Sequence, residues 1–455
     1  MDIEQFEDSD LAHYSYAISS EGLVALIDPA RDPQPYYNLV EKLQARIVAV
    51  IETHPHADFV SSHLEIHRQT GAPIYCSSLT GAAYPSQPFE EGREIQLGDA
   101  TLRALDTPGH SPDSISVVLS DTKDHDHAVF TGDCLFVGDC GRPDLREETG
   151  AIHRRREDLA RQQYHSLRKL LNLRDDVIVY PAHGSGSLCG RSLSTQKHST
   201  IGAEKISNWS LQPITETDFI AGLLENQPFV PRYFSYNVEV NRKGAPDFKA
   251  SIAQVHVGDS IDDAGALKRL TPGITIVDTR PQQHYKQAHA ENSINLQIGP
   301  KFETWLGSLL APEEKFYLAT GQRDEIPVLL GRIAKIGYEG FIQEAFVLRY
   351  GDKTIPPLDL LAFKNDPDRF RIIDVRNPEE RGNVWFDHTI AIPLPSLRDR
   401  IEEIPLDKPL VVHCATGYRS AAAASILSDI LGNKADVFDL GSAINKFQSH
   451  TSIPQ

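Results

Sequence analysis

Residues 52–59, with the sequence ETHPHADF, place three potential metal ligands within five residues: His54, His56 and Asp58. This stretch directly follows residues 47–51, a β-branched apolar run that predicts a buried strand. A loop at the end of a rigid strand is where metal-binding and catalytic residues usually lie in α/β folds. A solvated, histidine-rich turn would have the same composition, so the interpretation depends on further donors downstream.

Three more donors follow apolar runs in the same way. His110, Asp133 and His183 come just after runs at residues 101–105, 128–130 and 177–179. The sequence therefore predicts four strand ends that bring their donors to one place. Imidazole and carboxylate donors suit zinc or non-haem iron, and the pattern does not fit an all-thiolate site.

A second group of residues that could do chemistry lies near the C-terminus. Residues 410–413 predict a buried strand, Cys414 begins the six-residue loop CATGYR, which includes Arg419, and residues 420–427 predict a helix. Backbone N–H groups and a helix N-terminus at such a turn stabilise a thiolate and bind anions. Cys414 is therefore a predicted nucleophile, with a buried structural cysteine as the alternative.

The second half of the chain contains an internal repeat. Asp374 lies 96 residues after Asp278 in matching segments, and Cys414 lies 96 residues after Leu318 in the segments CATGYR and LATGQR. Two gapless matches at one offset indicate duplicated domains, and each copy alternates predicted strands and helices, which favours a parallel sheet. Because Leu318 stands at the cysteine position, the middle copy is expected to act as a spacer or docking surface without chemistry of its own.

Composition limits the partners. The chain has 455 residues, enough for about three domains. Its formal net charge of −18 argues against nucleic acid and against an anionic membrane surface. The acidic N-terminus does not resemble a signal peptide, and no apolar run is long enough to span a membrane. Five scattered cysteines without a CxxC pair argue against a disulfide framework, so we expect a reducing, cytoplasmic location; a homo-oligomer is left open.

In order, the segments HPHAD, TPGH, TGD and PAHG resemble the metallo-β-lactamase superfamily, and residues 138–144, GDCGRPD, resemble its persulfide dioxygenase branch. This resemblance implies an αββα sandwich over residues 1–243. Hydrolytic members have a histidine after the aspartate that helps to hold a second metal, whereas this chain has Phe59, which weakens two-metal hydrolysis. The Asp-x-Arg segments and the CATGYR loop resemble rhodaneses, which implies an inactive domain at 250–350 and an active domain at 355–455.

Together these resemblances imply a persulfide dioxygenase–rhodanese fusion. One Fe(II) per chain would be held by His54, His110 and Asp133, a set that leaves positions open for a low-molecular-weight thiol persulfide and O₂. Groups orienting the ligands or handling protons would be His56, Asp58 and His183. Arg142 would clamp the substrate, and Cys414 with Arg419 would exchange sulfur among sulfite, thiosulfate and persulfide. The alternative is a glyoxalase-II-like zinc thioester hydrolase with zinc at His54, His56 and His110.

Two further cysteines are candidates for a sulfur relay. Cys189 lies six residues after His183 between glycines that allow close backbone approach, and Arg191 is expected to lower its pKa. Cys140 competes for the role because it lies two residues before Arg142. For each cysteine, packing as a small apolar side chain is the alternative.

Overall fold

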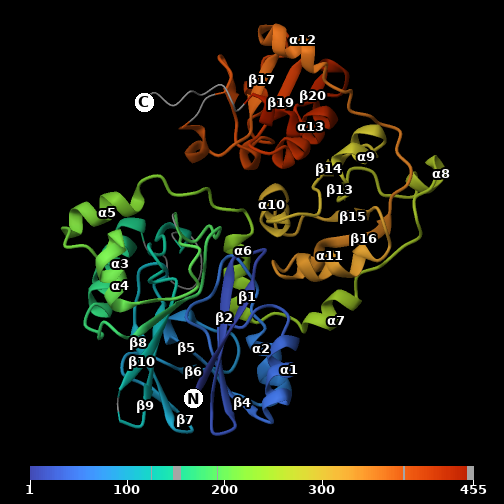
Figure 1. The fold of residues 1–455 in the computed structure, drawn as a ribbon. Helices are drawn as coiled ribbons and strands as arrows, with labels where there is room; N and C mark the ends of the chain where they lie inside the picture. The colour runs from blue at the N-terminus through green and yellow to red at the C-terminus, as the bar shows by residue number, and fades with distance from the viewer. Residues whose placement is uncertain (124, 147–154, 192, 383–384, 448–455) are drawn as a thin grey trace. The chain divides into compact units, whose positions relative to one another are not determined.

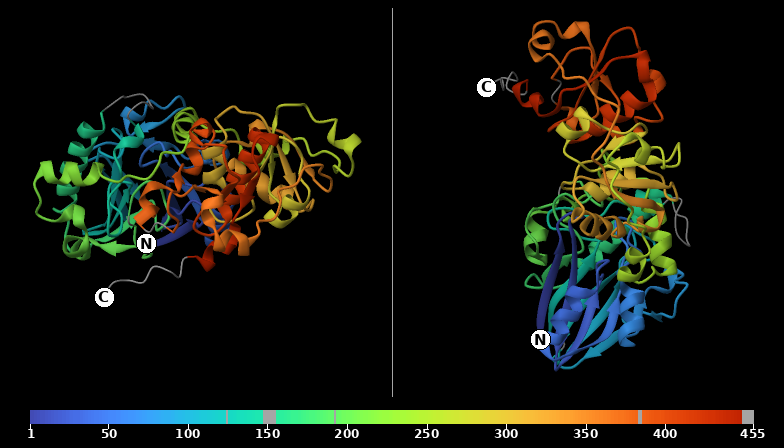
Figure 2. Two further views of the ribbon diagram at one scale, coloured as in Figure 1. Left: turned by 90° about the horizontal axis from the view of Figure 1, so that it is seen from above. Right: turned by 90° about the vertical axis from the view of Figure 1, so that its right-hand side faces the viewer.

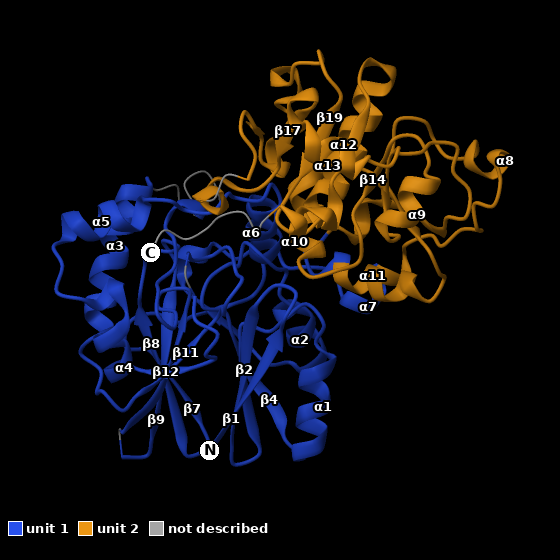
Figure 3. Cartoon of the chain, turned by 45° about the horizontal axis from the view of Figure 1, so that its top comes forward, with its two compact units in different colours: residues 1–251, 333–337 blue, residues 252–332, 338–455 orange. Residues whose placement is uncertain are grey.

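The computed structural model describes residues 1–123, 125–146, 155–191, 193–382 and 385–447 (Figure 1). The chain forms two compact units, residues 1–251 with 333–337 (unit 1) and residues 252–332 with 338–455 (unit 2) (Figure 3). The last part of the predicted domain 355–455, residues 448–455, lies outside the described residues. Among the helices of the described segments, none is long and apolar enough to cross a membrane.

Unit 1 is built on two six-stranded sheets. The first contains, in spatial order, β1 (Asp2–Asp8), β2 (His13–Ser20), β3 (Leu23–Ile27), β4 (Arg46–Ile51), β5 (Ile74–Cys76) and β6 (Gln87–Pro88). The second contains β12 (Ser199–Thr200), β11 (Ile178–Pro181), β10 (Asp126–Gly132), β9 (Ile115–Asp121), β8 (Ala100–Asp106) and β7 (Glu94–Leu97). The strand before residues 52–59, β4, lies where the sequence predicts it.

Alternating side chains of the two sheets pack face to face. Tyr16 and Ile18 of β2 and Val117 and Leu119 of β9 belong to one buried apolar cluster, as expected for strands whose side chains alternate between two faces. The outer faces carry α1 (Gln34–Leu43) and α2 (His63–Thr70) on one sheet and α3 (Arg156–Leu170), α4 (Ile201–Ser207) and α5 (Glu216–Leu224) on the other (Figure 1, Figure 2). This is the predicted αββα sandwich. Two further helices follow in the chain, α6 (Phe234–Lys243) and α7 (Phe248–Ala253).

Unit 2 contains two four-stranded parallel sheets with the same strand order. The middle copy has β14 (Ser293–Asn295), β13 (Thr275–Asp278), β15 (Phe316–Thr320) and β16 (Ile342–Val347). The C-terminal copy has β18 (Ile390–Ala391), β17 (Arg371–Asp374), β19 (Leu410–His413) and β20 (Val437–Asp439). Their helices are α8 (Ala264–Leu267), α9 (Gln282–Gln287), α10 (Phe302–Leu309) and α11 (Glu325–Ala334), then α12 (Leu360–Asn365) and α13 (Tyr418–Leu431).

The register of the two sheets corrects one expectation. Asp278 pairs with Ala319, whereas Asp374 pairs with His413, so the next residues along these strands are Thr320 and Cys414. Relative to the neighbouring strand, Thr320 and not Leu318 takes the place of Cys414. The sequence match misses this difference because a slip of two residues along a strand keeps every side chain on the same face, and the apolar pattern is unchanged.

Candidate functional site

His54, His110 and Asp133 come together in unit 1 as a single buried group whose ligand atoms all lie within 4.8 Å of one another. From Oδ2 of Asp133, Nε2 of His110 is 3.3 Å away and Nε2 of His54 is 3.8 Å away. Ligands that sit about 2.0–2.2 Å from one metal ion are themselves about 3 Å apart. The three side chains are thus close to the spacing that one ion requires.

Hydrogen bonds fix both imidazoles in the tautomer that a metal ligand needs. Nδ1 of His54 donates to Oγ1 of Thr53 at 3.0 Å, since that hydroxyl itself donates to Asp28 at 2.8 Å. Nδ1 of His110 donates to the carbonyl oxygen of Arg142 at 2.8 Å. In each ring the proton is on Nδ1, so the lone pair of Nε2 is directed towards the carboxylate of the group.

The carboxylate of Asp133 supports a cation at this point. Its Oδ1 accepts a hydrogen bond of 2.7 Å from Nδ1 of His183, while Oδ2 is buried and has no hydrogen-bond partner among the described residues. Burial alone would raise the pKa of Asp133, but its interactions with the neighbouring histidines, first of all the charge of His183 and the hydrogen bond from it, outweigh burial and hold the pKa well below its usual value. A buried carboxylate oxygen without a partner is costly, so these donors fit a metal ion.

His183 connects Asp133 to Asp58. Its Nε2 donates to Oδ2 of Asp58 at 2.7 Å, so both ring nitrogens donate to carboxylates. Burial lowers the pKa of His183, but the charges of Asp133 and Asp58 outweigh it and raise the pKa well above its ordinary value. His183 is therefore held as an imidazolium beside the predicted ligand Asp133.

His56 belongs to a different group. Its Nε2 lies 3.1 Å from Oδ1 of Asp28, and these two residues form a buried cluster with Glu52. Next along the loop, the buried ring of Phe59 lies tilted against two histidine rings. The distance between ring centroids is 3.8 Å to His13 and 4.4 Å to His56. The second histidine of the segment HPHAD thus has its Nε2 against Asp28, although its ring centroid is only 4.2 Å from that of His54, and an apolar ring follows Asp58.

Two buried amides that sequence reasoning missed hold the ligand loops. Nδ2 of Asn241, in α6, donates to the carbonyl oxygens of His56 and Phe59 at 2.8 and 2.7 Å, and its Oδ1 accepts from Ser61 at 2.8 Å. Oε1 of Gln163, in α3, accepts from the backbone of His110 at 2.9 Å. Both amides are far in sequence from the loops that they hold, so no local motif could reveal them.

In unit 2, Cys414 lies between β19 and α13 as predicted. The backbone N–H groups of Gly417 and Ser420 donate to its Sγ at 3.1 and 3.4 Å. Gly417 has φ +101°, and a Cβ there would lie 2.7 Å from the backbone of Gly441, so only glycine fits this turn. The loop therefore surrounds a buried sulfur with donors suited to a thiolate or persulfide anion.

The guanidinium of Arg419, in the same loop, pairs with both carboxylate oxygens of Glu380, one of them at 2.6 Å. The same guanidinium lies over the ring of Trp305 in the middle copy, 5.5 Å from its centroid. The predicted sulfur-transfer group therefore includes residues from both copies of unit 2.

Known families match both parts of the chain that carry these two groups of residues. Residues 8–183 match the metallo-beta-lactamase superfamily, and residues 357–450 match the rhodanese-like domain. The chain joins a metallo-β-lactamase domain to a rhodanese-like domain. The first match contains all four strand ends that supply donors, and the second contains Cys414.

Curated relatives of the metallo-β-lactamase domain have two different activities. The chain is 34% identical over 161 residues to the mitochondrial persulfide dioxygenase ETHE1 of Homo sapiens, covering 35% of this chain and 58% of that protein. It is 35% identical over 134 residues to a cytoplasmic hydroxyacylglutathione hydrolase of Arabidopsis thaliana. This match covers 29% of this chain and 52% of that protein. The chain thus spans less than two thirds of the length of each of these relatives.

A solved structure is similar over a longer span. The crystal structure of a metallo-beta-lactamase from Staphylococcus aureus is 29% identical, with a TM-score of 0.67, and the match covers 76% of this chain and 99% of that one. This share exceeds residues 8–183, so the similarity extends beyond the metallo-β-lactamase domain into the part of the chain that follows it.

Arg142 is buried beside the metal group of the metallo-β-lactamase domain. Its guanidinium donates to both oxygens of Asp144, at 2.7 and 2.6 Å, and to the carbonyl oxygen of Leu188 at 3.3 Å. The backbone carbonyl oxygen of Arg142 accepts the hydrogen bond from Nδ1 of His110. The structure therefore gives Arg142 a part in positioning a ligand, and the substrate-clamp role stays a prediction.

Cys189 lies in the metallo-β-lactamase domain, and its sulfur is within 4.8 Å of ligand atoms of Asp58 and His183. Burial, followed by the charges of Asp58 and Asp133, raises its pKa well above the ordinary value. The expectation that Arg191 lowers this pKa is wrong, because the guanidinium of Arg191 donates to the carbonyl oxygens of Gly222 and Glu225, at 2.8 and 2.9 Å, instead.

Cys140, the second relay candidate, packs in the apolar cluster under α3 with Cys134 and Leu135. Burial, with the charge of Asp139, raises its pKa well above the ordinary value. Its surroundings match the packing alternative.

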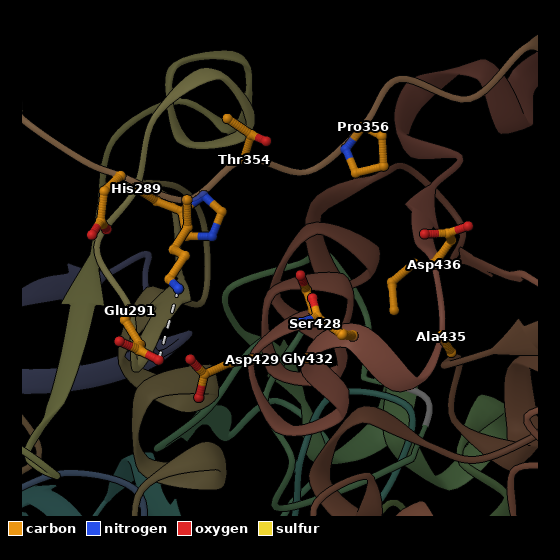
Figure 4. Close-up of a pocket in the computed structure, with 13 residues that line it drawn as sticks. His289, Glu291, Thr354, Pro356, Ser428, Asp429, Gly432, Ala435 and Asp436 are labelled. Carbon is orange, nitrogen blue, oxygen red and sulfur yellow. Dashed lines mark ion pairs between the residues drawn. The ribbon is translucent and has the colours of Figure 1, made fainter.

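A polar pocket of about 340 Å³ lies elsewhere in unit 2 (Figure 4). Its lining includes His289 and Glu291 of the middle copy and Asp429 and Asp436 of the C-terminal copy. Because Asp429 is near the end of α13 and Cys414 precedes the start of this 14-residue helix, the pocket is at the opposite end of α13 from the sulfur of Cys414.

Proposed function

We propose that this protein is a cytoplasmic non-haem iron persulfide dioxygenase coupled to a sulfurtransferase. A low-molecular-weight thiol persulfide, such as glutathione persulfide, would react with O₂ and water to give the thiol and sulfite. Sulfite, thiosulfate and persulfide would then be interconverted at Cys414. The observation that carries the proposal is that His54, His110 and Asp133 form one group from which His56 is separate. The five cysteines are free thiols, which supports a reducing location.

The residues have distinct roles in this proposal. One Fe(II) per chain, bound by two histidines and one carboxylate, would supply a centre with open positions for persulfide and O₂. Thr53 and the carbonyl of Arg142 orient the two imidazoles. His183, hydrogen-bonded to Asp58 and Asp133, holds a proton beside the ligand carboxylate.

The alternative is a zinc thioester hydrolase, supported by the similarity to hydroxyacylglutathione hydrolases. A three-histidine zinc site would need His56 to turn from Asp28 towards His54 and His110, and a second ion would lack the donor that Phe59 replaces. These two features support the iron proposal over the hydrolase.

Metal analysis with two activity assays tests the choice. We expect about one iron per chain, O₂ uptake with glutathione persulfide, and loss of both in His54→Ala, His110→Ala and Asp133→Ala. The exposed His165, which pairs with Glu216 at 3.1 Å, provides the control His165→Ala, which should keep both. Two tightly bound zinc ions with full thioester hydrolysis and no O₂ uptake would favour the hydrolase.

We propose that Cys189 receives or relays sulfur between the iron site and Cys414. Cys189→Ser should lower the thiosulfate yield relative to sulfite without lowering iron content. Cys76→Ser, at another buried cysteine of unit 1, is the matched control. An unchanged product ratio at matched iron would leave Cys189 as a packing residue.

A further inference from the structure

The middle copy contacts the loop that carries Cys414. The hydroxyl of Tyr418 donates to the carbonyl oxygen of Gln297 at 2.8 Å. A Cβ added to Gly299 would lie 3.2 Å from the Tyr418 ring, so the segment that begins at Gln297 passes closely over it. Tyr418 is four residues after Cys414, which places this segment at the sulfur-transfer loop.

The next residue of the loop is held by the same segment. The guanidinium of Arg419 lies over the ring of Trp305, with 5.5 Å to the centroid, and Trp305 is only 8% exposed. This is a cation–π contact, which an arginine commonly makes with the face of a tryptophan ring. Two consecutive residues of the loop thus have their positions set by residues 297–305.

Lys301 adds a positive charge to this surface. It is the N-cap residue of α10, and the N–H of Trp305 donates to its carbonyl oxygen at 3.0 Å, so Lys301 lies one turn before Trp305 at the start of the helix. Lys301 is exposed, and within the described part of unit 2 its ammonium has no ion-pair partner, whereas Arg419 is paired with Glu380. Although the residue as a whole is exposed, partial desolvation of its ammonium lowers the pKa of Lys301, the charge of Arg419 lowers it further and the charge of Glu380 raises it, which places the ammonium near both side chains of the loop's ion pair.

We propose that Lys301 and Trp305 of the middle copy are specificity-determining residues of the sulfur-transfer site and favour small anionic sulfur compounds at Cys414. The inference rests on the proposed function of Cys414. In the step concerned, the Cys414 thiolate attacks the outer sulfur of thiosulfate and forms a new S–S bond. The S–S bond of thiosulfate breaks, and sulfite leaves with its electron pair. Three negative charges meet at the loop, where an unpaired ammonium attracts the incoming dianion.

The test uses the full-length chain with thiosulfate as sulfur donor and glutathione as acceptor. Lys301→Glu should raise KM for thiosulfate by roughly tenfold at low salt and less at high salt, with kcat nearly unchanged, because only attraction of the anion is altered. Lys301→Gln should give a smaller rise in KM, and Trp305→Leu should also raise it. The control is Lys268→Glu, the same charge change at an exposed lysine that follows α8, which should leave KM unchanged.

A second measurement does not need turnover. Iodoacetate is an anion and iodoacetamide is its neutral analogue, so the ratio of their alkylation rates at Cys414, followed by peptide mass spectrometry, reports the local charge. Lys301→Glu should lower this ratio at least about threefold, and Lys268→Glu should not. An unchanged ratio and KM in Lys301→Glu would overturn the inference. Absence of thiosulfate activity in the unmodified protein, with a lowered ratio in Lys301→Glu, would instead count against the proposed function.

Discussion

The two copies in unit 2 have the same sheet but use the loop after the third strand differently. In the C-terminal copy, N–H groups of Gly417 and Ser420 are directed at the sulfur of Cys414. In the middle copy, N–H groups of Gly321 and Gln322 both donate to Oε2 of Glu325, at 3.0 Å each. One loop directs its donors at a cysteine sulfur, while the other has its donors occupied by the protein's own carboxylate.

The supporting structure has been kept in both copies. Arg280 pairs with Asp278 at 2.6 Å, and Arg376 pairs with Asp374 at 2.7 Å, each at the end of the equivalent strand. The middle copy thus differs in the loop after the third strand and not where the sheet is braced. The middle copy nevertheless takes part in the loop that carries Cys414, since Trp305 and Gln297 contact that loop.

The largest effect is expected from Cys414→Ser. Because a hydroxyl cannot carry the sulfane sulfur, sulfurtransferase activity should fall to background, while O₂ uptake stays largely intact in a separate domain. Sulfite and thiosulfate are measured together with oxygen consumption, with Cys76→Ser as control. Loss of O₂ uptake in Cys414→Ser would show that the two sites are obligately coupled.

Leu318→Ala tests whether Leu318, in the third strand of the middle copy, contributes only to stability. Leu318 is fully buried in β15, so the change should lower the free energy of unfolding by about 2–5 kcal/mol. The control is Leu361, which is 70% exposed. Leu361→Ala should change the free energy of unfolding by less than about 0.5 kcal/mol. Urea unfolding followed by tryptophan fluorescence measures both. Equal, small effects would contradict the burial of Leu318.

Glu325→Ala should have the smallest effect. It removes the acceptor of two N–H groups near the surface, and the expected loss of stability is about 0.5–1.5 kcal/mol. Hydrogen exchange at Gly321 and Gln322 should become faster, and Glu402→Ala, at an exposed glutamate, should leave it unchanged. Unaltered exchange in Glu325→Ala would mean that the carboxylate does not occupy the loop in solution.

The sequence alone predicted the parts of the molecule that local patterns encode. Apolar runs followed by His54, His110, Asp133 or His183 indicated strand ends, and the structure brings these four residues to one place. The αββα sandwich and the strand–Cys414–helix turn followed from the same patterns and from family resemblance. The structure groups His54 and His110 with Asp133, and the role of these three residues as the iron ligands stays a prediction.

What the sequence could not provide depends on contacts between distant segments. Asn241 and Gln163 hold loops that lie 53 or more residues away in sequence, and an amide in a helix gives no local sign of its partner. The strand register in the middle copy was likewise hidden, because Leu318 and Thr320 lie on the same face of β15. The charge near Cys189 was misjudged because Arg191 finds backbone acceptors that only the fold brings close.

The three hydrogen bonds of Asn241 have a consequence for biosynthesis. The loop with His54 and Asp58 leaves the ribosome long before α6, which holds it 180 or more residues later in the chain. A nascent chain that ends before Asn241 therefore contains every predicted iron ligand but lacks the clamp on one of its ligand loops. Stable iron loading is expected only after α6 has been made and docked, so that the metal enters a finished domain and not a growing one.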